Sequence, residues 1–234
     1  MLRLDGLIAG YGRTMVLQGL SLSVDTAETV AVLGRNGVGK TTLLRAVMGL
    51  IPLSSGTITL DDARIERLPP HARARRGLAY VPQGREVFPR LSVLENLRVA
   101  GYGSRQRDWL PRLEAIFEEF PFLAERRSAR AGSLSGGQQQ ILAVARALLT
   151  NPRALLLDEP SEGIQPSIVD QIAETIRSIN VERRISVVLV EQNLEFAAEL
   201  AERAFLMDKG QIVRSLSPAE LLEDRVLQRE YMGV

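Results

Sequence analysis

The sequence predicts an α/β protein with three parts: a core of buried strands and helices, an N-terminal antiparallel β-subdomain and an inserted α-helical subdomain. Two observations predict the core. Short apolar runs recur along the chain, and segments whose apolar residues have helical spacing accompany them. The runs are residues 29–33, 77–81, 154–157 and 185–190. Short alternating segments with turns at the N-terminus predict the β-subdomain. We expect one domain over residues 1–234, with the β-subdomain at about 1–30 and 56–62, the core at about 31–90 and 150–234, and the helical subdomain at about 91–149.

The composition is that of an ordinary globular protein, with 45% hydrophobic and 24% charged residues among 234. A formal net charge of +1 does not indicate a general nucleic-acid binder, so we expect no nucleic-acid partner. The absence of cysteine excludes disulfides and thiolate metal sites. The N-terminus does not resemble a signal peptide, and no apolar run reaches the roughly 18 residues of a membrane-spanning helix. We therefore expect a soluble, cytoplasmic protein that needs a partner for any work at a membrane.

Residues 34–42 (GRNGVGKTT) carry the motif around which the core is organised. Gly34, Gly39, Lys40 and Thr41 fit the phosphate-binding pattern G-x-x-x-x-G-K-[ST] between a predicted strand and a predicted helix, as the motif requires. There the backbone N–H groups and the positive end of the helix dipole bind phosphate oxygens. Lys40 reaches the β- and γ-phosphates, and the Thr41 hydroxyl can bind Mg²⁺. A glycine-rich turn without a ligand is disfavoured, because strand, lysine and hydroxyl all occupy the required places.

The segments 2–4, 20–24 and 57–60 predict a small antiparallel sheet beside the core. Tyr11 lies between two glycines in a predicted turn, which is a poor place for a core aromatic. An exposed tyrosine there could stack on a nucleobase, or it could simply cover the edge of the sheet. The residues alone leave both interpretations open.

Residues 61–76 are polar and basic and predict a surface connection with a short helix. We interpret the only histidine, His71, as a solvated loop residue within it. The next buried strand, 77–81, ends in Pro82 and Gln83. Open α/β sheets bind ligands at the carboxyl ends of their strands, so Gln83 is a candidate ligand-binding residue.

The region from residue 91 to about residue 132 predicts a helical insert. Ser92 and Glu95 fit the capping box S-x-x-E before a helix, and residues 108–123 place apolar side chains at helical spacing. We expect the only tryptophan, Trp109, to pack within this insert rather than to form part of a site.

The sequence LSGGQ, residues 134–138, stands directly before a predicted helix at 139–149. Ser135, Gly136 and Gly137 offer a hydroxyl and free N–H groups at a helix start, which suits a second phosphate, and Ser135 lies 95 residues after Lys40. On its own, the same pattern fits an ordinary serine cap equally well.

Asp158 and Glu159 follow the buried strand at 154–157, and alternation along a strand points their side chains in different directions. One carboxylate can hold Mg²⁺ while the other faces the attacking nucleophile. Burial of two acids is costly unless positive charge meets them, and Mg²⁺ with Lys40 would supply that charge.

The rest of the chain continues the alternation of helices and strands. The buried strand 185–190 ends in Glu191, Gln192 and Asn193. We expect helices at 168–179 and 194–203, a hairpin of 204–207 with 211–213, and a last helix that Ser217 caps.

Taken together, the motifs GRNGVGKT, PQ, LSGGQ and LLLDEP resemble the ATPase subunit of an ABC transporter over nearly the whole chain. The resemblance implies a P-loop NTPase (RecA-like) core that binds ATP and Mg²⁺ and hydrolyses ATP. It also implies that two subunits close head to tail, so that LSGGQ of one subunit completes the phosphate site of the other. Such closure would explain why one chain carries two helix starts suited to phosphate.

The resemblance assigns roles to the residues that match the family's motifs. It implies that Glu159 is the catalytic base, that Lys40 and Gln192 assist catalysis, and that Tyr11 stacks on adenine. Gln83 is implied as the sensor of the γ-phosphate and the link to the membrane subunits. The implied metal-binding residues are Thr41, Gln83 and Asp158. The implied nucleotide-binding residues are Tyr11, Gly34, Arg35, Asn36, Gly37, Val38, Gly39, Lys40, Thr41, Thr42 and Gln83, and the signature residues acting in trans are Leu134, Ser135, Gly136, Gly137 and Gln138.

Two departures from the wider family narrow the resemblance. Residues 162–165 read EGIQ where many members have SALD, and Gln192 stands where many members have a switch histidine. Both departures resemble ATPases that serve importers of branched-chain amino acids, together with relatives that serve urea or short amides. The implied partners are a second ATPase subunit, identical or paralogous, two transmembrane permease subunits and, indirectly, a solute-binding protein. The implied location is the inner face of the cell membrane, where the chain would be a peripheral subunit.

Three other kinds of ABC protein share these motifs. Chromosome and DNA-repair ATPases carry a long coiled-coil insert, whereas only 95 residues separate Lys40 from Ser135 here, without sustained heptads. Translation-type proteins carry two ATPase units, whereas this chain has one GKT and one LSGGQ. A lipopolysaccharide-export ATPase is a closer alternative, although a switch histidine is expected there. The transported solute is set by the partner subunits, so this sequence does not identify it.

Overall fold

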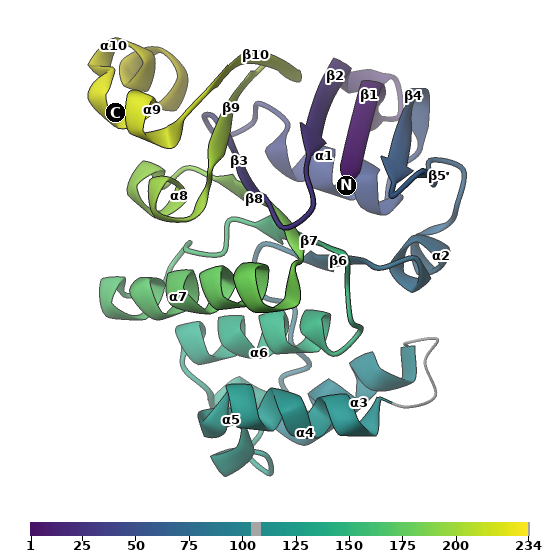
Figure 1. The fold of residues 1–234 in the computed structure, drawn as a ribbon, viewed down its shortest axis with the longest axis vertical. Coiled ribbons are helices and arrows are strands. Elements are labelled where there is room, and N and C mark those ends of the chain that lie inside the picture. Colours follow the sequence, from purple (N-terminus) through teal and green to yellow (C-terminus); the bar gives the residue numbers. More distant parts are fainter. Residues whose placement is uncertain (104–108, 234) are drawn as a thin grey trace.

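The computed structural model describes residues 1–103 and 109–233, which form two β-sheets with helices around the larger sheet (Figure 1). The larger sheet has six strands in the order β10-β9-β3-β8-β7-β6, and the smaller sheet has four in the order β2-β1-β4-β5. An antiparallel β part, a core with a parallel sheet and a helical part are all present, so the predicted fold class is confirmed. The residue boundaries that we give to the three parts stay a prediction.

The larger sheet forms the core and is parallel except where β10 pairs with β9. Its strands are β3 (Thr29–Leu33), β6 (Leu78–Val81), β7 (Ala154–Asp158), β8 (Ser186–Glu191), β9 (Arg203–Asp208) and β10 (Gln211–Leu216). Every residue of β3, β7 and β8 is buried, because both faces of the sheet are covered. Since these strands are parallel, the segments after β3, β6, β7 and β8 meet at one edge of the sheet.

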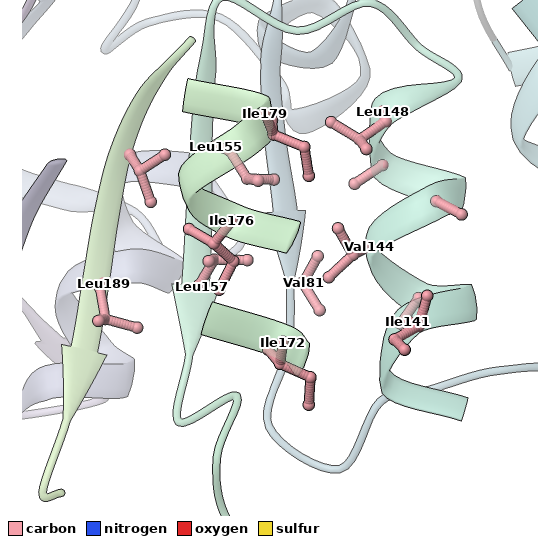
Figure 2. Packing of buried hydrophobic residues seen from close by; sticks show 14 of the residues in the cluster. Val81, Ile141, Val144, Leu148, Leu155, Leu157, Ile172, Ile176, Ile179 and Leu189 are labelled. Atoms are coloured by element: carbon pink, nitrogen blue, oxygen red, sulfur yellow. The ribbon is translucent and has the colours of Figure 1, made fainter. Parts of the chain in front are cut away.

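Side chains of the central strands alternate between two apolar clusters, one on each face of the sheet. In β7, Leu155 and Leu157 belong to the cluster beneath the helices α6 (Gly136–Leu148) and α7 (Pro166–Arg183), whereas Ala154 and Leu156 belong to the cluster beneath α1 (Lys40–Met48) and the smaller sheet. Figure 2 shows the first cluster, with isoleucines of α7 and apolar residues of α6 directed toward the strands. The two faces therefore hold the helical part and the β part on opposite sides of one sheet.

Three of the four strands of the smaller sheet, β1, β2 and β4, are longer than the sequence pattern indicated. Its strands are β1 (Leu2–Tyr11), β2 (Thr14–Val24), β4 (Leu53–Leu60) and β5 (Ala63–Arg64). Strands β1 and β2 pair over their whole length, but their register shifts between Leu4 and Leu7 and again near Gly10. Gly6 has a φ of 60°, in the left-handed region that suits a bulge. Bulges interrupt the alternation of apolar residues, so the pattern shows only the regular ends of each strand.

The remaining helices of the core part are short. They are α2 (Pro70–Arg75), α8 (Leu194–Leu200), α9 (Pro218–Glu223) and α10 (Arg225–Leu227), followed by a π-helical turn at Gln228–Met232. Ser217 caps α9 through a capping box with Glu220, as predicted. His71 is exposed on α2 rather than in an irregular loop. Helix α8 ends three residues before the predicted position, because Arg203 already belongs to β9.

The helical part contains α3 (Val93–Gly103), α4 (Leu110–Glu119), α5 (Pro121–Glu125), a 3-10 turn at Ala131–Ser133 and α6. Ser92 and Glu95 exchange the two hydrogen bonds of the predicted capping box, at 2.7 and 3.1 Å. Trp109 is 9% exposed and belongs to the apolar cluster under α6, so the expectation that it packs is confirmed. Asp108, where we expect a helix to begin, lies outside the described residues. None of the described helices is long and apolar enough to cross a membrane.

Candidate active site

The phosphate-loop motif connects β3 to α1 at the carboxyl edge of the larger sheet. Gly39 is the N-cap of α1 and carries no side chain to cap it, so the first N–H groups of the helix are available to an anion. Gly34 allows the loop to lie against β9, because a Cβ there would stand 2.4 Å from the carbonyl oxygen of Met207. At Gly39, with a φ of 114°, a Cβ would stand 2.9 Å from the Met207 side chain. The glycines therefore serve both backbone conformation and close packing.

Lys40 is 5% exposed and folds back along the loop that precedes it. Its Nζ donates hydrogen bonds to the carbonyl oxygens of Gly34, at 2.8 Å, and Arg35, at 3.2 Å. The same Nζ lies 3.3 Å from Oε1 of Glu159, in a pair whose side chains are both almost fully buried. A buried lysine needs such partners, and here they hold the ammonium group at the mouth of the loop.

The loop residues, together with neighbouring side chains, enclose a cavity of about 300 Å³. It is lined by Val16, Asn36, Gly37, Gly39, Lys40, Thr41, Thr42, Gln83 and Glu159. This size suits the phosphate end of a nucleotide rather than a whole nucleotide. Two predicted loop residues direct their side chains elsewhere, since Arg35 donates to the carbonyl oxygen of Arg229 at 2.7 Å and Val38 packs against the apolar cluster of the core.

Asp158 ends β7 and is 1% exposed. Its Oδ1 accepts a hydrogen bond from the Thr41 hydroxyl at 3.0 Å, and its Oδ2 accepts one from the Tyr80 hydroxyl at 2.8 Å. Burial raises the pKa of the Asp158 carboxyl, and these two hydrogen bonds oppose the rise. Burial and the neighbouring carboxylate also raise the pKa of Tyr80, which keeps its hydroxyl protonated as a donor.

Thr41 and Asp158 together are suited to Mg²⁺. A hydroxyl and a carboxylate 3.0 Å apart are hard oxygen donors, and Mg²⁺ takes one or two protein ligands while substrate phosphates and water complete its shell. No hydrogen bond in the described part of the chain joins Gln83 to either residue. A hydrogen bond thus joins Thr41 to Asp158, Gln83 lines the same phosphate cavity as Thr41, and the metal-binding role of all three residues stays a prediction.

Glu159 is the point on which the predicted catalytic side chains converge. Its Oε1 contacts Lys40 and accepts a hydrogen bond from Gln192 Nε2 at 3.1 Å, while its Oε2 accepts one from Gln83 Nε2 at 3.0 Å. The residue has a φ of 46°, in the left-handed region that is strained for a glutamate. Asp158 and Glu159 thus have separate partners, although β7 ends at Asp158 and the alternation along a strand does not extend to Glu159.

Gln192 follows β8 and reaches across the site. Its Nε2 also donates to Oδ1 of Asn36 at 2.5 Å, so one amide group links the phosphate loop to Glu159. Gln83 in turn donates a second hydrogen bond, at 2.8 Å, to Glu162. Segments that follow four different strands, β3, β6, β7 and β8, are therefore tied together at this edge of the sheet.

Tyr11 lies apart from this cluster. It ends β1, is 46% exposed, and lines a different cavity of about 750 Å³ together with Arg45 and Tyr80. A hydrogen bond with Tyr11 is the main interaction that raises the pKa of the Arg45 guanidinium, and a hydrogen bond with Tyr80 adds to the rise. Val16, which the sequence did not single out, lines the phosphate cavity instead.

The signature residues 134–138 also lie outside the phosphate cavity of their own chain. Ser135 caps α6, since its hydroxyl accepts from the N–H of Gln138 at 3.3 Å and the side chain of Gln138 accepts from the N–H of Ser135 at 3.1 Å. Packing requires a glycine at position 137, because a Cβ there would stand 2.1 Å from the side chain of Ile168 on α7. The cap is thus present, and a role in the site of a second subunit stays a prediction.

Tyr80 is a second site residue that sequence reasoning missed, besides Val16. A hydroxyl at the penultimate position of an otherwise apolar buried strand was the available signal, since β6 pairs with β7 and brings Tyr80 beside Asp158. The sequence alone does not say which face of the strand Tyr80 occupies.

Comparisons with known proteins identify the family. The model of a family described as ABC transporter matches residues 17–162, more than half of the chain. The chain is 40% identical, over all of both proteins, to the "High-affinity branched-chain amino acid transport ATP-binding protein BraG" of Pseudomonas aeruginosa. It is 36% identical to the "Probable branched-chain amino acid transport ATP-binding protein LivF" of Archaeoglobus fulgidus, over 100% of this chain and 99% of that protein. It is also 36% identical to the "Lipopolysaccharide export system ATP-binding protein LptB" of Escherichia coli K12, over 97% and 95%.

Solved structures agree with the fold and the family. A nucleotide-free ATP-binding cassette from an ABC transporter superposes with a TM-score of 0.87 at 23% identity, covering 97% of this chain and 96% of that one. A dimeric cassette in a post-hydrolysis state, bound to ADP and phosphate, gives a TM-score of 0.80 at 25% identity, covering 93% and 99%. The chain belongs to the ABC transporter family, and its enzymatic activity is the hydrolysis of ATP.

Proposed function

We propose that the chain is the ATPase subunit that energises an importer of branched-chain amino acids or of urea and short amides. The observation that carries this proposal is Gln192, which occupies the switch position and contacts both the phosphate loop and Glu159. Glutamine at this position is a feature of the importer branch that the sequence resembles. The full-length similarity to two branched-chain amino acid transport proteins supports the same choice.

A lipopolysaccharide-export ATPase is the second candidate, favoured by 36% identity to LptB over nearly the whole chain. Gln192 disfavours the exporter function, because a histidine is expected at the switch position of that exporter. The two functions are separated by deleting the protein in its own cells and measuring uptake of labelled leucine and labelled urea. Loss of uptake of either solute supports the importer. Unchanged uptake together with lipopolysaccharide held in the inner membrane would establish the exporter instead.

The proposed mechanism assigns each residue of the site one task. Water attacks the γ-phosphorus, the bond from the β–γ bridging oxygen to that phosphorus breaks, and Glu159 takes the proton of the attacking water. Lys40 and the N–H groups at the start of α1 stabilise negative charge on the phosphates. Thr41 and Asp158 would hold Mg²⁺, which supplies further positive charge to the phosphate oxygens. Gln192 and Gln83 orient Glu159 through the hydrogen bonds of 3.1 and 3.0 Å that they donate to it.

We further propose that a second ATPase subunit completes the site and that two permease subunits dock beside it. The cavity of about 750 Å³ lies between α1 and β6 on one side and α3 and α6 on the other, which suits a helix of a permease subunit. Arg85 and Glu86, which are two and three residues after Gln83, also line it. Movement of Gln83 can therefore reach this cavity through the adjacent backbone. Such docking would place the chain at the inner face of the membrane.

Mixing two inactive variants tests whether Ser135 acts in trans. The variants are Ser135→Arg, which blocks the start of α6, and Lys40→Ala, which removes the phosphate-loop lysine. A mixed dimer then contains one intact site, so ATPase activity is expected to reappear when the two are combined. The measurement is the steady-state ATPase rate across mixing ratios, with each variant alone as the control. A rate of zero at every ratio, with mixed dimers present, would contradict a shared site.

Replacing Tyr11 by alanine tests its assignment to adenine. If Tyr11 stacks on the base, nucleotide affinity should fall by about 1–3 kcal/mol, which is the usual range for base–aromatic stacking. Calorimetric titration with ATP measures this change. Tyr102→Ala is the matched control, because Tyr102 is also exposed but lies on α3. Equal affinity of wild type and Tyr11→Ala would assign Tyr11 to the sheet edge and to its contact with Arg45.

A further inference from the structure

Glu191 is a buried carboxylate at the end of β8 whose interactions differ from those of the other site acids. The residue is 2% exposed. Within residues 1–103 and 109–233 no ion pair includes it, so no side-chain cation neutralises it. Burial raises the pKa of its carboxyl, and hydrogen bonds from Ser161, Asn193 and Gln192 oppose that rise. A group that is costly to bury and lacks a cation requires a compensating function or strong hydrogen bonds.

Three backbone N–H groups from two separate turns donate to the Glu191 carboxylate, and the Ser161 side chain also hydrogen-bonds to it. Oε1 accepts from the N–H of Ser161 at 3.0 Å. Oε2 accepts from the N–H of Gln192 at 2.9 Å and from the N–H of Asn193 at 3.1 Å. Both oxygens are therefore used, each toward a different turn. Hydrogen bonds from N–H groups to a carboxylate are among the stronger ones in proteins.

The two turns are those that carry Glu159 and Gln192. Ser161 stands two residues after Glu159 in the turn that follows β7, and Gln192 begins the turn that follows β8. The N–H of Glu159 also donates to the carbonyl oxygen of Val190 at 3.0 Å. The turn after β7 is thus fixed to the end of β8 at two points, one of which is the Glu191 carboxylate.

We infer that Glu191 is a positioning residue that holds Glu159 and Gln192 in register by binding the backbone of both turns. This inference rests on the proposed roles of Glu159 and Gln192 in hydrolysis. Glu191 touches neither side chain through its carboxylate, so it acts through the backbone of Ser161 and Gln192. Its two oxygens set the spacing across which Gln192 Nε2 donates to Glu159 at 3.1 Å.

The chemistry requires a carboxylate rather than an amide at this place. The three backbone donors are N–H groups, the Ser161 side chain is a further partner, and an ionised carboxylate accepts with both oxygens. A glutamine has one accepting oxygen, and its NH₂ group would face either Ser161 or the pair of Gln192 and Asn193. In each orientation the NH₂ group faces at least one backbone N–H, that hydrogen bond is lost, and one turn is held more weakly. Aspartate keeps both oxygens on a side chain shorter by one methylene.

The test compares Glu191→Gln and Glu191→Asp with wild type by steady-state kinetics and thermal unfolding. For Glu191→Gln we expect kcat to fall about tenfold while KM for ATP stays within about twofold, because phosphate binding depends on the other turn, between β3 and α1. Glu191→Asp should retain more of the rate. Glu28→Gln is the matched control, since Glu28 is buried, accepts a backbone N–H from Asp25 at 2.7 Å and lies at the opposite end of β3. This control is expected to lower the melting temperature without the drop in kcat.

A double mutant separates positioning from general damage to the fold. In a Gln192→Ala background only the positioning of Glu159 through Ser161 remains, so the effect of Glu191→Gln on kcat should be clearly smaller there than in the wild-type background. An undiminished effect there, or a wild-type kcat in Glu191→Gln, would overturn the inference. If Glu191→Gln does not fold, Glu191→Asp decides by the same pair of measurements. Full hydrolysis by Glu159→Gln and Gln192→Ala would instead overturn the proposed roles on which the inference rests, so the two failures are distinguishable.

Discussion

Replacing Glu159 by glutamine is expected to slow ATP hydrolysis by about 10²–10⁴-fold while MgATP still binds. Glutamine keeps the shape of the side chain but cannot accept the proton of the attacking water. The lost group is also the one on which Lys40, Gln83 and Gln192 converge. Phosphate binding should persist, because it depends on the N–H groups of the loop and on Lys40, which keeps its two carbonyl partners.

Single-turnover hydrolysis and equilibrium ATP binding measure the two halves of this prediction. Glu162→Gln is a close control, because Glu162 also accepts a hydrogen bond from Gln83, at 2.8 Å, but lies one turn farther along the chain. Its rate should stay near that of wild type. Gel filtration with ATP should show a larger species for Glu159→Gln, since a closed dimer that cannot hydrolyse ATP persists. Wild-type turnover in Glu159→Gln would remove it from the role of base.

The sequence was sufficient for the core because its signals are strong and local. Strand β3 matches the predicted bounds of 29–33, and β7 extends only to include Asp158. Strand β8 begins one residue later than predicted and extends to include Glu191. Asp158 and Glu191 are polar residues that the apolar pattern could not assign to a strand. The smaller sheet was harder to predict from the sequence, because the register shifts of β1 break the alternation of apolar residues on which a strand prediction depends. A sequence pattern of period two identifies regular strands and misses strands that contain a bulge.

The candidate site divides in the same way. Lys40, Asp158 and Glu159 could be predicted from the sequence because each belongs to a motif of fixed spacing at the end of a buried strand. Tyr80 and Glu191 could not be predicted in this way, because their importance comes from contacts between residues far apart in the sequence. Tyr80 donates a hydrogen bond to Asp158 on a neighbouring strand, and Glu191 accepts one from Ser161 across the sheet edge. No spacing in the sequence encodes a contact of that kind.

Replacing Gln192 by alanine is expected to lower the ATPase rate about 10- to 100-fold, the effect of losing one hydrogen bond to a charged group in the transition state. In the structure Gln192 Nε2 donates to both Glu159 and Asn36, so alanine would free Glu159 from one of its orienting partners. Asn193→Ala is the matched control. The side chain of Asn193 caps α8 by accepting from the N–H of Phe196 at 3.1 Å, so its loss should cost about 0.5–2 kcal/mol of stability and leave the rate nearly unchanged.

Replacing Gln192 by histidine separates positioning from proton transfer. Glutamine donates through its NH₂ group and does not titrate near neutral pH, so its contribution to the wild-type rate should not change between about pH 5.5 and 8.5. A histidine there titrates near pH 6.5, and its neutral form still donates one N–H. Below that pH the imidazolium would pair with the Glu159 carboxylate and hinder it as a base, so the rate of Gln192→His should fall as the pH drops through about 6–7. Rates of the three proteins across this range at saturating MgATP provide the measurement. Equal rates for wild type and Gln192→Ala would exclude Gln192 as the switch residue, and Asn193 would become the candidate.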